Sequence, residues 1–570
     1  MKFGNDDDTI GRALGAYRDG QVSRRGFLKM ATAAGVGIGL AGTLASIWSP
    51  QARAQSTRTS PVPRQAFDYI VIGGGSSGAT LAAQLAMRSD AQVLLLEAGV
   101  QDTAPEIHDP RDWPKVLGMP LTRVFNTTPQ AHADNRSVAW PRTQTLGGCS
   151  AVNCMIYQRG HVSDFDSWAH EGCYGWDFAS VLPAYKALEH WQGGASEYRG
   201  DRGPLFVTQP APGHRHPGAE AFMAQAIAMG YAENPDFNGP SMEGPTWVNF
   251  TIAGGKRQSS AVAFLHPAME QRSNLTVLCE APALELVMER GRCVGVKYLH
   301  DGKPAMVRAS REVVLSAGAI ASPWLLMLSG IGPEAELRKH GIAVQHALPG
   351  VGQNLHDHVL GGGLNWEAKA PVPASEYNMS ETYFWTKSNP GLRAPDINTL
   401  YVSLPFHTPE LPATFENGYS ILTGVMRPSS RGQITLASKD PRVDPLIDPA
   451  YLTTEQDRRA FLAATELGRE IGNGEAFAGI RKREVLPGPS VQSKADMEAF
   501  LRKACSTFFH PVGTCRMGTG SDAVVDPELR VHGVEGLRVA DASIMPSITT
   551  GNTNAPSILI GWKAAEMLSA

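Results

Sequence analysis

Residues 67–97 carry the pattern that most restricts the fold of this chain. A short β-rich run in "FDYIVIGGGSSGATLAAQLA" leads into Gly73-x-Gly75-x-x-Gly78 and then into a helical pattern. Glycines with this spacing permit a tight turn, a close approach of the backbone to a pyrophosphate, and close helix–strand packing. A second buried-strand pattern ends at Glu97, whose carboxylate can accept hydrogen bonds from a ribose diol. A glycine-rich turn without a ligand is the alternative, but elements in this order predict a dinucleotide-binding β-α-β unit.

Residues 1–54 have the pattern of a targeting segment. The stretch "SRRGFLK" is followed by an apolar run from residue 31 to 48 and then by the small-residue pattern "ARA". This order resembles a twin-arginine signal peptide, with residues 55–65 as a flexible linker. An uncleaved membrane anchor is the alternative, since about 18 apolar residues can just span a bilayer. We expect a periplasmic or secreted protein, exported by a pathway associated with proteins that leave the cell folded, often around a cofactor.

Charge and cysteine content argue against two other classes of function. The chain has 51 Lys and Arg against 55 Asp and Glu, a formal charge of −4, without a long basic run. A nucleic-acid partner is therefore not expected. The seven cysteines include no C-x-x-C pair and no Cys/His spacing typical of a metal site, so no metal is expected. Their odd number leaves at least one thiol without an intrachain partner.

The glycine motif alone does not distinguish NAD from FAD. Export favours FAD, because the soluble nicotinamide pool stays in the cell and a tightly held flavin travels with the folded protein. Two longer stretches, "PRTQTLGGCSAVNCMIYQRG" and "GAIASPWLLMLSGIGP", resemble the two sequence signatures of the glucose–methanol–choline (GMC) oxidoreductases. Further similar segments are "SSAVAFLHPAMEQRSNLTV", "PGVGQNLHDH", "HPVGTCRMG", "LRVADASIMP" and "GNTNAPSILIGWKAAEML". The resemblance runs from Phe67 to the C-terminus and is greatest to choline oxidases and choline dehydrogenase-like members.

This resemblance implies an α/β fold with two domains. One is a Rossmann-like FAD-binding domain assembled from discontinuous segments, which we expect at residues 66–165, 213–358 and 505–570. The other is an α+β substrate-binding domain with an antiparallel sheet, which we expect at residues 166–212 and 359–504.

The resemblance also implies which residues hold the FAD. The glycine turn and Glu97 would bind the pyrophosphate and the ribose. The remaining family positions correspond to Arg142, Gly147, Gly148 and Asn153 around the flavin and its phosphates, to Ala283 beside the adenine, and to Asp541 and Ala542 near the pyrophosphate and ribityl chain. An ordinary turn is the alternative for Gly147 and Gly148. Some members bind the flavin covalently through a histidine just before the asparagine, but Val152 has no nucleophile, so non-covalent FAD is expected.

Two residues are expected to carry the chemistry. Oxidation of an alcohol moves a hydride to flavin N5 while a base takes the hydroxyl proton, and an imidazole suits that role. His510 in "STFFHPVGT" matches the catalytic histidine of the family, although a histidine so placed is otherwise more often structural. The partner position is Asn552, which can donate a hydrogen bond to the substrate oxygen but cannot act as a base; a turn or helix cap is the alternative. The last helix is expected to begin near Asn554 and to direct its positive end toward the flavin.

The expected substrate site lacks the groups that would bind a cation. Choline oxidases carry a glutamate two residues after "DH" and a histidine before a Ser-x-Pro-Phe-like segment, and these positions are Leu360 and Leu400 here. Phe508 and Cys154 are expected nearby. The aromatic-rich segment 371–389 is expected either as a lid or as a surface loop. These residues favour an uncharged aliphatic or aromatic alcohol over choline, and over sugars, whose hydroxyl groups would each need a partner.

Together these features predict an exported FAD-dependent alcohol dehydrogenase that passes electrons to a quinone, a cytochrome or another acceptor. A peripheral membrane or cytochrome partner is compatible with that function. One alternative is an oxidase of the same family that uses oxygen. Others are a flavin-containing protein like the hydroxynitrile lyases and a flavin-binding protein without catalysis, which the matches at His510 and Asn552 disfavour.

Overall fold

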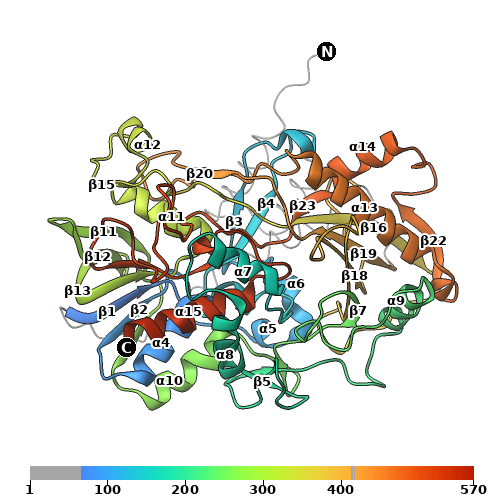
Figure 1. The fold of residues 1–570 in the computed structure, drawn as a ribbon, viewed down its shortest axis with the longest axis horizontal. Coiled ribbons are helices and arrows are strands. Elements are labelled where there is room, and N and C mark those ends of the chain that lie inside the picture. Colours follow the sequence, from blue (N-terminus) through green and yellow to red (C-terminus); the bar gives the residue numbers. More distant parts are fainter. Residues whose placement is uncertain (1–65, 412–414, 416, 570) are drawn as a thin grey trace, which may run out of the picture.

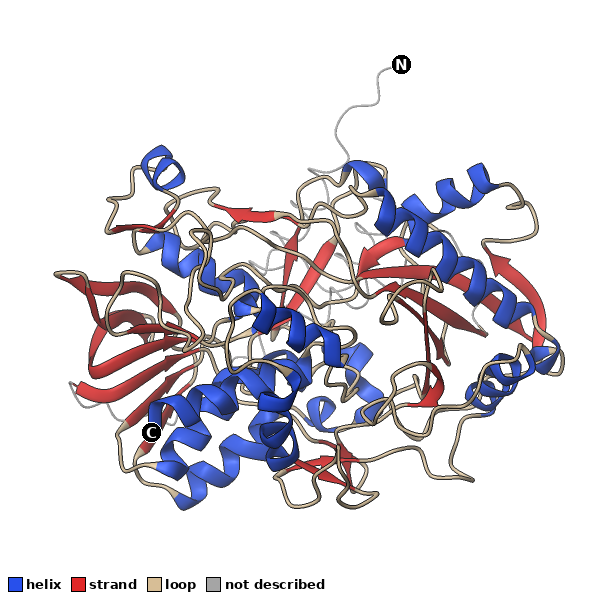
Figure 2. Ribbon diagram, viewed as in Figure 1, coloured by secondary structure: helices blue, strands red, loops and turns tan. Residues whose placement is uncertain are grey.

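The computed structural model describes residues 66–411, 415 and 417–569. The expected signal peptide and linker, residues 1–65, lie outside them. The described chain forms two large sheets side by side, each of seven strands and each packed against its own helices (Figures 1 and 2). Among these residues, no helix is both long enough and apolar enough to cross a bilayer.

The first sheet is built around the predicted β-α-β unit. Its order is β10-β2-β1-β13-β12-β11, and β24 also pairs with β13. Strands β10, β2, β1, β13 and β24 are parallel to one another, whereas β12 pairs antiparallel with both β13 and β11. All four residues of β2 are buried, as expected for a parallel strand covered on both faces. The strands are β1 (Ala66–Ile72), β2 (Val93–Leu96), β10 (Leu275–Leu278), β11 (Ala283–Glu289), β12 (Arg292–His300), β13 (Lys303–Leu315) and β24 (Leu537–Val539).

Two helices from opposite ends of the described chain pack together on this sheet. Helix α4 (Ser76–Arg88) follows the glycine turn, and helix α15 (Asn554–Ser569) ends the chain. Their first residues meet, because Ser76 Oγ donates a hydrogen bond of 2.7 Å to Asn554 Oδ1. A side chain at Gly561 would overlap the carbonyl oxygen of Ser77, so only glycine lets the two backbones approach so closely. The positive ends of both helices therefore lie at one place.

The second sheet is antiparallel and has the order β22-β16-β19-β18-β17-β7, with β23 paired to β16. Helices α9, α13 and α14 pack against it (Figure 1). Side chains alternate between its faces: Ile397 and Tyr401 join the core that includes α13, whereas Leu400 faces the other side. The elements are β7 (Gly244–Trp247), β16 (Val359–Ala368), β17 (Thr382–Thr386), β18 (Ile397–Val402), β19 (Gly418–Val425), β22 (Arg481–Leu486), β23 (Cys505–Thr507), α9 (Pro217–Ala228), α13 (Glu455–Asn473) and α14 (Lys494–Ala504).

The remaining elements lie outside these two sheets. The strands are β3 (Thr122–Asn126), β4 (Ala139–Thr143), β5 (Glu189–Trp191), β6 (Leu205–Val207), β8 (Ile252–Ala253), β9 (Lys256–Arg257), β14 (Ile331–Gly332), β15 (His346–Ala347), β20 (Gln433–Thr435) and β21 (Leu446–Asp448). The α-helices are α5 (Pro105–His108), α6 (Trp113–Val116), α7 (Val162–His170), α8 (Phe178–Leu188), α10 (His266–Gln271), α11 (Gly318–Leu328) and α12 (Glu334–Lys339). Other helical turns are η2 (Pro110–Asp112), η3 (Ala131–Ala133), η4 (Gly148–Ala151), the π-helix η5 (Ala261–Leu265), η6 (Glu475–Phe477) and η7 (Ala542–Ile544).

Several elements lie away from the domain expected for their residue range. Strand β23 falls in 505–570, expected to bind FAD, but it pairs with β16 of the second sheet. Strand β7 falls in 213–358, expected to bind FAD, but it pairs with β17 of the second sheet. Helix α9, in the same range, also packs there, because its contacts are with β7, β17 and β18. Helix α8 falls in 166–212, expected to bind substrate, yet it packs on α15 of the first domain. Within segment 371–389, residues 382–386 are neither lid nor surface loop: they form the buried strand β17.

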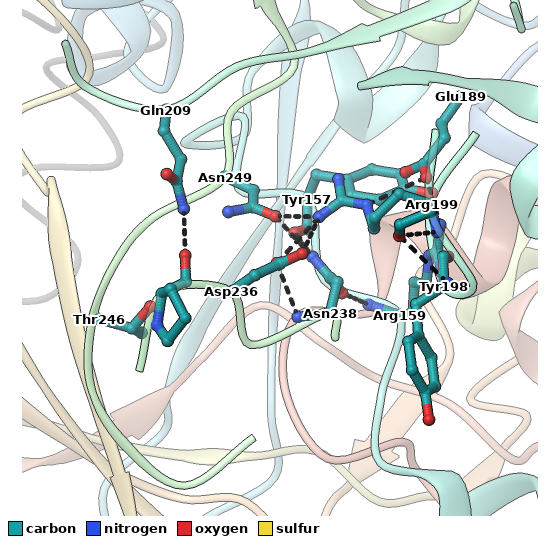
Figure 3. Close-up of polar contacts among 12 residues, drawn as sticks. Tyr157, Arg159, Glu189, Tyr198, Arg199, Gln209, Asp236, Asn238, Thr246 and Asn249 are labelled. Atoms are coloured by element: carbon teal, nitrogen blue, oxygen red, sulfur yellow. Dashed lines mark hydrogen bonds and ion pairs between the residues drawn. The ribbon is translucent and has the colours of Figure 1, made fainter. Parts of the chain in front are cut away.

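A buried ionic network lies around Arg159, a few residues after the expected FAD-binding residues 147–153 (Figure 3). Arg159 and Arg199 both reach Glu189 Oε1, at 2.5 and 3.0 Å, and all three side chains are almost fully buried. Arg199 also contacts Asp236 at 2.8 Å, so two arginines face two carboxylates. Asn249 accepts a hydrogen bond from Arg199 and joins this network to the loop after β7. Asn238 donates to Asn249 and to the carbonyl of Tyr157 and accepts the Arg159 N–H, so the network holds the backbone at 157–159.

Candidate active site

Two glycine loops touch where α4 begins. Gly73 and Gly148 have positive φ angles of 101° and 51°. A Cβ at Gly148 would lie 2.7 Å from the Cα of Gly75, and a Cβ at Gly78 would overlap the carbonyl oxygen of Gly73. Gly147 has φ of 84° and donates its backbone N–H to the carbonyl of Gly74 at 2.8 Å. The predicted glycines thus form one side-chain-free cradle at a helix N-terminus, which is where proteins bind phosphate groups.

Glu97 directly follows strand β2 and lies beside this cradle. Its carboxylate accepts 2.7 Å hydrogen bonds from the backbone N–H groups of Gly74 and Gly99. Burial raises its pKa, and these two amides act against that shift. Ala281 donates its N–H to the carbonyl of Glu97, and Ala283 begins β11 two residues later. The predicted ribose and adenine residues therefore come from neighbouring segments.

Arg142 and Asn153 lie on the other side of the cradle. Arg142 Nη1 donates to the carbonyl of Phe509 at 3.0 Å, while its buried Nε and Nη2 have no partner among the described residues. Asn153 Oδ1 accepts hydrogen bonds from the N–H of Met155 and from Arg257 Nη1, both at 3.0 Å. Arg257, which the sequence did not single out, is buried, and burial lowers its pKa to about 10. It anchors the loop that carries Asn153.

Asp541 and Ala542 lie at the start of the short helix η7. Asp541 Oδ2 accepts hydrogen bonds from the Gly318 N–H at 2.9 Å and from Ser322 Oγ at 2.6 Å, and Oδ1 accepts one from the Ser543 N–H. This side chain joins α11 to η7. Only the backbone at 541–542 is left to approach a cofactor.

His510 is held in place by buried groups that the sequence analysis did not assign. Its backbone N–H donates to Asp357 Oδ1 at 2.8 Å, and Asp357 Oδ2 accepts hydrogen bonds from Thr507 Oγ1 and the Tyr451 hydroxyl. The preceding residue, Phe509, has φ of 67°, a left-handed conformation that is rare for an aromatic residue. The Arg142 and Thr507 contacts to the Phe509 backbone stabilise this conformation. The loop therefore presents His510 in one fixed orientation.

The imidazole of His510 lies between a second histidine and Asn552. His510 Nδ1 is 2.9 Å from His358 Nδ1, and His510 Nε2 is 3.3 Å from Asn552 Nδ2. Asn552 Oδ1 in turn accepts a hydrogen bond of 3.1 Å from the Tyr383 hydroxyl. Burial lowers the pKa of His510 well below its usual value and that of His358 to about 3, so both imidazoles are neutral near pH 7.

These contacts select one tautomer of His510. The Asn552 amide donates to Nε2, so Nε2 must carry the lone pair and Nδ1 the proton. His358 Nδ1 then accepts that proton's hydrogen bond. Because Nε2 keeps its lone pair, it can act as a base toward a ligand beside Asn552. Asp164 fixes the loop that carries Asn552, since it accepts hydrogen bonds from the Thr550 N–H and hydroxyl.

An apolar surface faces this pair. We call the side of the second sheet that bears Leu360, Leu400, Leu422, Tyr383 and Trp385 the catalytic face. These side chains form one buried cluster with Met155, Phe250, Met426 and Phe508, against which Cys154 packs. Phe508 stacks on His510 with ring centroids 5.1 Å apart. The four residues expected near the substrate thus lie together with His510 and Asn552.

The sequence analysis assigned no role to three residues that contact His510 or Asn552 in the structure. His358 and Asp357 belong to "NLHDH", which was read only as a family segment, and Tyr383 lay in the segment expected as a lid or loop. The local signal at 357–358 was two titratable residues directly before a buried β-strand. Nothing local marked Tyr383, because its role depends on pairing between distant strands. By contrast, His510 and Asn552, 42 positions apart in sequence, are brought into contact as the motif required.

Comparison with known proteins decides the family. Residues 67–360 and 428–561 match the N- and C-terminal parts of the GMC oxidoreductases. The chain belongs to the GMC oxidoreductase family. Human mitochondrial choline dehydrogenase is 39% identical over 538 residues, covering 89% of this chain and 90% of the relative. The acceptor-dependent alcohol dehydrogenase of Pseudomonas putida is 38% identical over 537 residues, 88% of this chain and 95% of the relative.

Solved structures of GMC flavoenzymes share the fold. Pyridoxine 4-oxidase from Mesorbium loti superposes with a TM-score of 0.85 at 36% identity, covering 88% of this chain and 98% of the other. Formate oxidase from Aspergillus oryzae gives a TM-score of 0.82 at 26% identity, with 89% and 98% covered. The predicted combination of a Rossmann-like domain and an antiparallel sheet is confirmed. This GMC oxidoreductase is a flavoenzyme acting on CH–OH groups.

The residues of the cradle fit an FAD. The glycine loops leave no side chain between the first turn of α4 and Gly148, and Glu97 directly follows the neighbouring strand. The two unpartnered nitrogens of Arg142 are buried groups that need an acceptor, and a flavin or its phosphates supply several. Val152 is buried in a small apolar cluster beside this loop, and its side chain has no atom that could form a bond to a flavin.

Proposed function

We propose that this GMC oxidoreductase is an exported FAD-dependent alcohol dehydrogenase that oxidises a neutral aliphatic or aromatic alcohol to an aldehyde or ketone. The observation that carries the proposal is the pairing of His510 with Asn552 opposite an apolar sheet face. Bound FAD supplies the acceptor for the hydride that leaves the carbinol carbon.

The chain's own residues handle the proton and the oxygen. His510 Nε2 takes the hydroxyl proton while the hydride departs, and the resulting imidazolium keeps its Nδ1 hydrogen bond to His358. When the substrate hydroxyl replaces Asn552 as the partner of His510 Nε2, the Asn552 amide N–H can donate to the substrate oxygen and stabilise its developing negative charge. The buried apolar residues of the catalytic face exclude water from this exchange.

The leucines at 360 and 400 support a neutral substrate. Both are buried in the catalytic-face cluster. A quaternary ammonium there would lose its hydration without gaining a carboxylate, a cost of several kcal/mol. The choline dehydrogenases among the relatives show that the overall fold is compatible with choline; the proposal rests on the two side chains that differ from the choline oxidase pattern.

Three further parts of the proposal rest on the sequence pattern. The segment "SRRGFLK" and the residues after it support export of the folded, flavin-loaded protein. Val152 supports non-covalent FAD. A quinone or cytochrome is the acceptor that suits an exported enzyme separated from the soluble nicotinamide pool. Acid precipitation of the purified protein should release the flavin into the supernatant, whereas a covalent flavin would stay in the pellet.

An anaerobic flavin-reduction screen tests the proposal. Neutral alcohols should bleach the bound flavin, and choline should do so far more slowly. His510→Ala should slow bleaching by about 100-fold or more, whereas His214→Ala, which alters an exposed histidine, should leave it unchanged. Faster bleaching by choline than by any neutral alcohol would contradict the substrate assignment. Turnover with an electron-accepting dye but not with oxygen would support a dehydrogenase. Turnover with oxygen but not with the dye would support an oxidase.

A further inference from the structure

We propose that Asn398 and Trp385 form a polar recognition subsite on the catalytic face. It would bind a hydrogen-bonding group, such as a second hydroxyl or a carbonyl, at the end of the alcohol remote from its carbinol. This inference rests on the proposed function and defines its substrate class more closely.

The two residues are direct cross-strand neighbours. Trp385 in β17 is paired with Asn398 in β18, and both belong to the register positions that face the catalytic pair, as do Tyr383 and Leu400. Opposed residues of an antiparallel pair have Cβ atoms about 5 Å apart. A substrate group between the indole nitrogen and the amide could therefore contact both.

Glycine on the next strand leaves room for the Asn398 side chain. Gly424 in β19 is paired with Asn398, and a Cβ at Gly424 would overlap Asn398 Oδ1 and lie 2.8 Å from Phe508 Cε2. The Asn398 amide thus lies over the backbone of Gly424, with the Met426 methyl group and the Phe508 ring beside it. Phe508 stacks on His510, so one aromatic ring separates the amide from the base. On the other strand, the Trp385 ring lies 5.5 Å from that of Tyr383, which contacts Asn552.

The polar atoms of this pair have no partners within the described chain. Asn398 is 1% exposed and Trp385 is fully buried. Asn398 Oδ1, Asn398 Nδ2 and Trp385 Nε1 all lack a hydrogen bond. Buried amides and indole N–H groups are nearly always paired in folded proteins, because an unpaired one is costly. The nearby Tyr383 hydroxyl follows that rule through Asn552, so the unpaired atoms on the same face point to a ligand that completes them.

The unpaired atoms define the chemistry of that ligand. They provide one acceptor and two donors in an otherwise apolar surrounding, and no charge. A terminal hydroxyl can donate to Asn398 Oδ1 while it accepts from Trp385 Nε1, and a carbonyl can accept from both nitrogens. A purely hydrocarbon end would leave all three atoms unpaired. The subsite therefore favours neutral alcohols with a second polar group over simple alkanols of the same size.

Matched pairs of alcohols test this selectivity on the flavin-loaded enzyme. In each pair a terminal hydroxyl replaces a methyl group: the terminal pentanediol against hexanol, and para-benzenedimethanol against para-ethylbenzyl alcohol. The ratio of anaerobic flavin-reduction efficiencies within a pair should favour the diol in the wild type. Asn398→Leu should lower that ratio by about tenfold or more. Trp385→Phe, which keeps an aromatic ring but removes the indole N–H, should lower it less.

Thr399→Val is the matched control. Thr399 follows Asn398 in β18, its buried Oγ1 also lacks a partner, and strand alternation turns it toward the opposite side of the sheet. It should not alter the ratio. If Asn398→Leu does not fold, Asn398→Ser and Trp385→Phe carry the test, with dissociation constants read from the flavin absorbance. Equal efficiencies for both members of each pair in the wild type would overturn the subsite but leave the proposed function standing. A flavin that no alcohol bleaches would instead overturn the proposed function.

Discussion

The contact between His358 and His510 gives a quantitative prediction. In His358→Leu, the Nδ1–H of His510 loses its acceptor, the Nδ1 of the buried His358. An unpaired buried N–H costs about 1–3 kcal/mol. The other tautomer avoids that cost but places the proton on Nε2, where it faces the Asn552 amide and removes the lone pair that acts as base. Because each 1.4 kcal/mol is about a factor of ten, flavin reduction should slow by about 10- to 100-fold.

His358→Asn separates this effect from a packing defect. The asparagine Oδ1 can lie near the position of the histidine Nδ1 and can accept the same hydrogen bond, so most of the rate should return. The measurement is anaerobic stopped-flow flavin reduction with a neutral alcohol, at equal flavin content and after melting temperatures have been compared. Wild-type rates in a folded, flavin-loaded His358→Leu protein would refute the assigned tautomer. So would an Asn variant as slow as the Leu variant.

Three further predictions concern the cofactor, the ionic network and pH. Gly148→Ala should purify without flavin, because its Cβ would press on Gly75. The control Gly175→Ala, also at positive φ but with open space around it, should keep its yellow flavin. A flavin-loaded Gly148→Ala protein would contradict the assignment of the glycine cradle as the flavin site. Glu189→Gln should lower the free energy of unfolding in urea by about 3–5 kcal/mol, since two buried arginines lose their shared carboxylate. The exposed Glu285→Gln should lower it by less than about 1 kcal/mol. Burial depresses the pKa of His510 below 6.5, so the base is already unprotonated at neutral pH. The flavin-reduction rate should stay flat from about pH 8 to 6.5 and fall only below that range; a midpoint above neutrality would contradict this.

The sequence predicted those features that short motifs encode. The glycine turn and the strand before Glu97 follow from local patterns, because each pattern meets a local steric need. The contact between His510 and Asn552 was expected from the family motifs, and the catalytic roles of these two residues stay predictions. Leu360 and Leu400 were also placed correctly beside Phe508, since each belongs to an alignable motif. Export and the bound state of the flavin stay predictions.

The rest depended on pairings between distant segments. Strand β7 joins the second sheet through β17, more than 130 positions away, and no local pattern specifies that partner. The same holds for Tyr383, which reaches Asn552 across 169 positions. Asn398 lies in an unremarkable strand sequence. Only its position opposite Gly424 and Trp385 shows that its amide has no partner.

The meeting of α4 and α15 has a consequence for biosynthesis. Ser76 and Asn554 are 478 positions apart, yet they join the first turns of the two helices that flank the glycine cradle. A nascent chain that has not yet formed helix α15 presents only one of the two helix N-termini that meet beside the glycine cradle. Insertion of the cofactor must then wait until synthesis is finished, and a chain truncated before residue 554 should emerge colourless however well its N-terminal part folds.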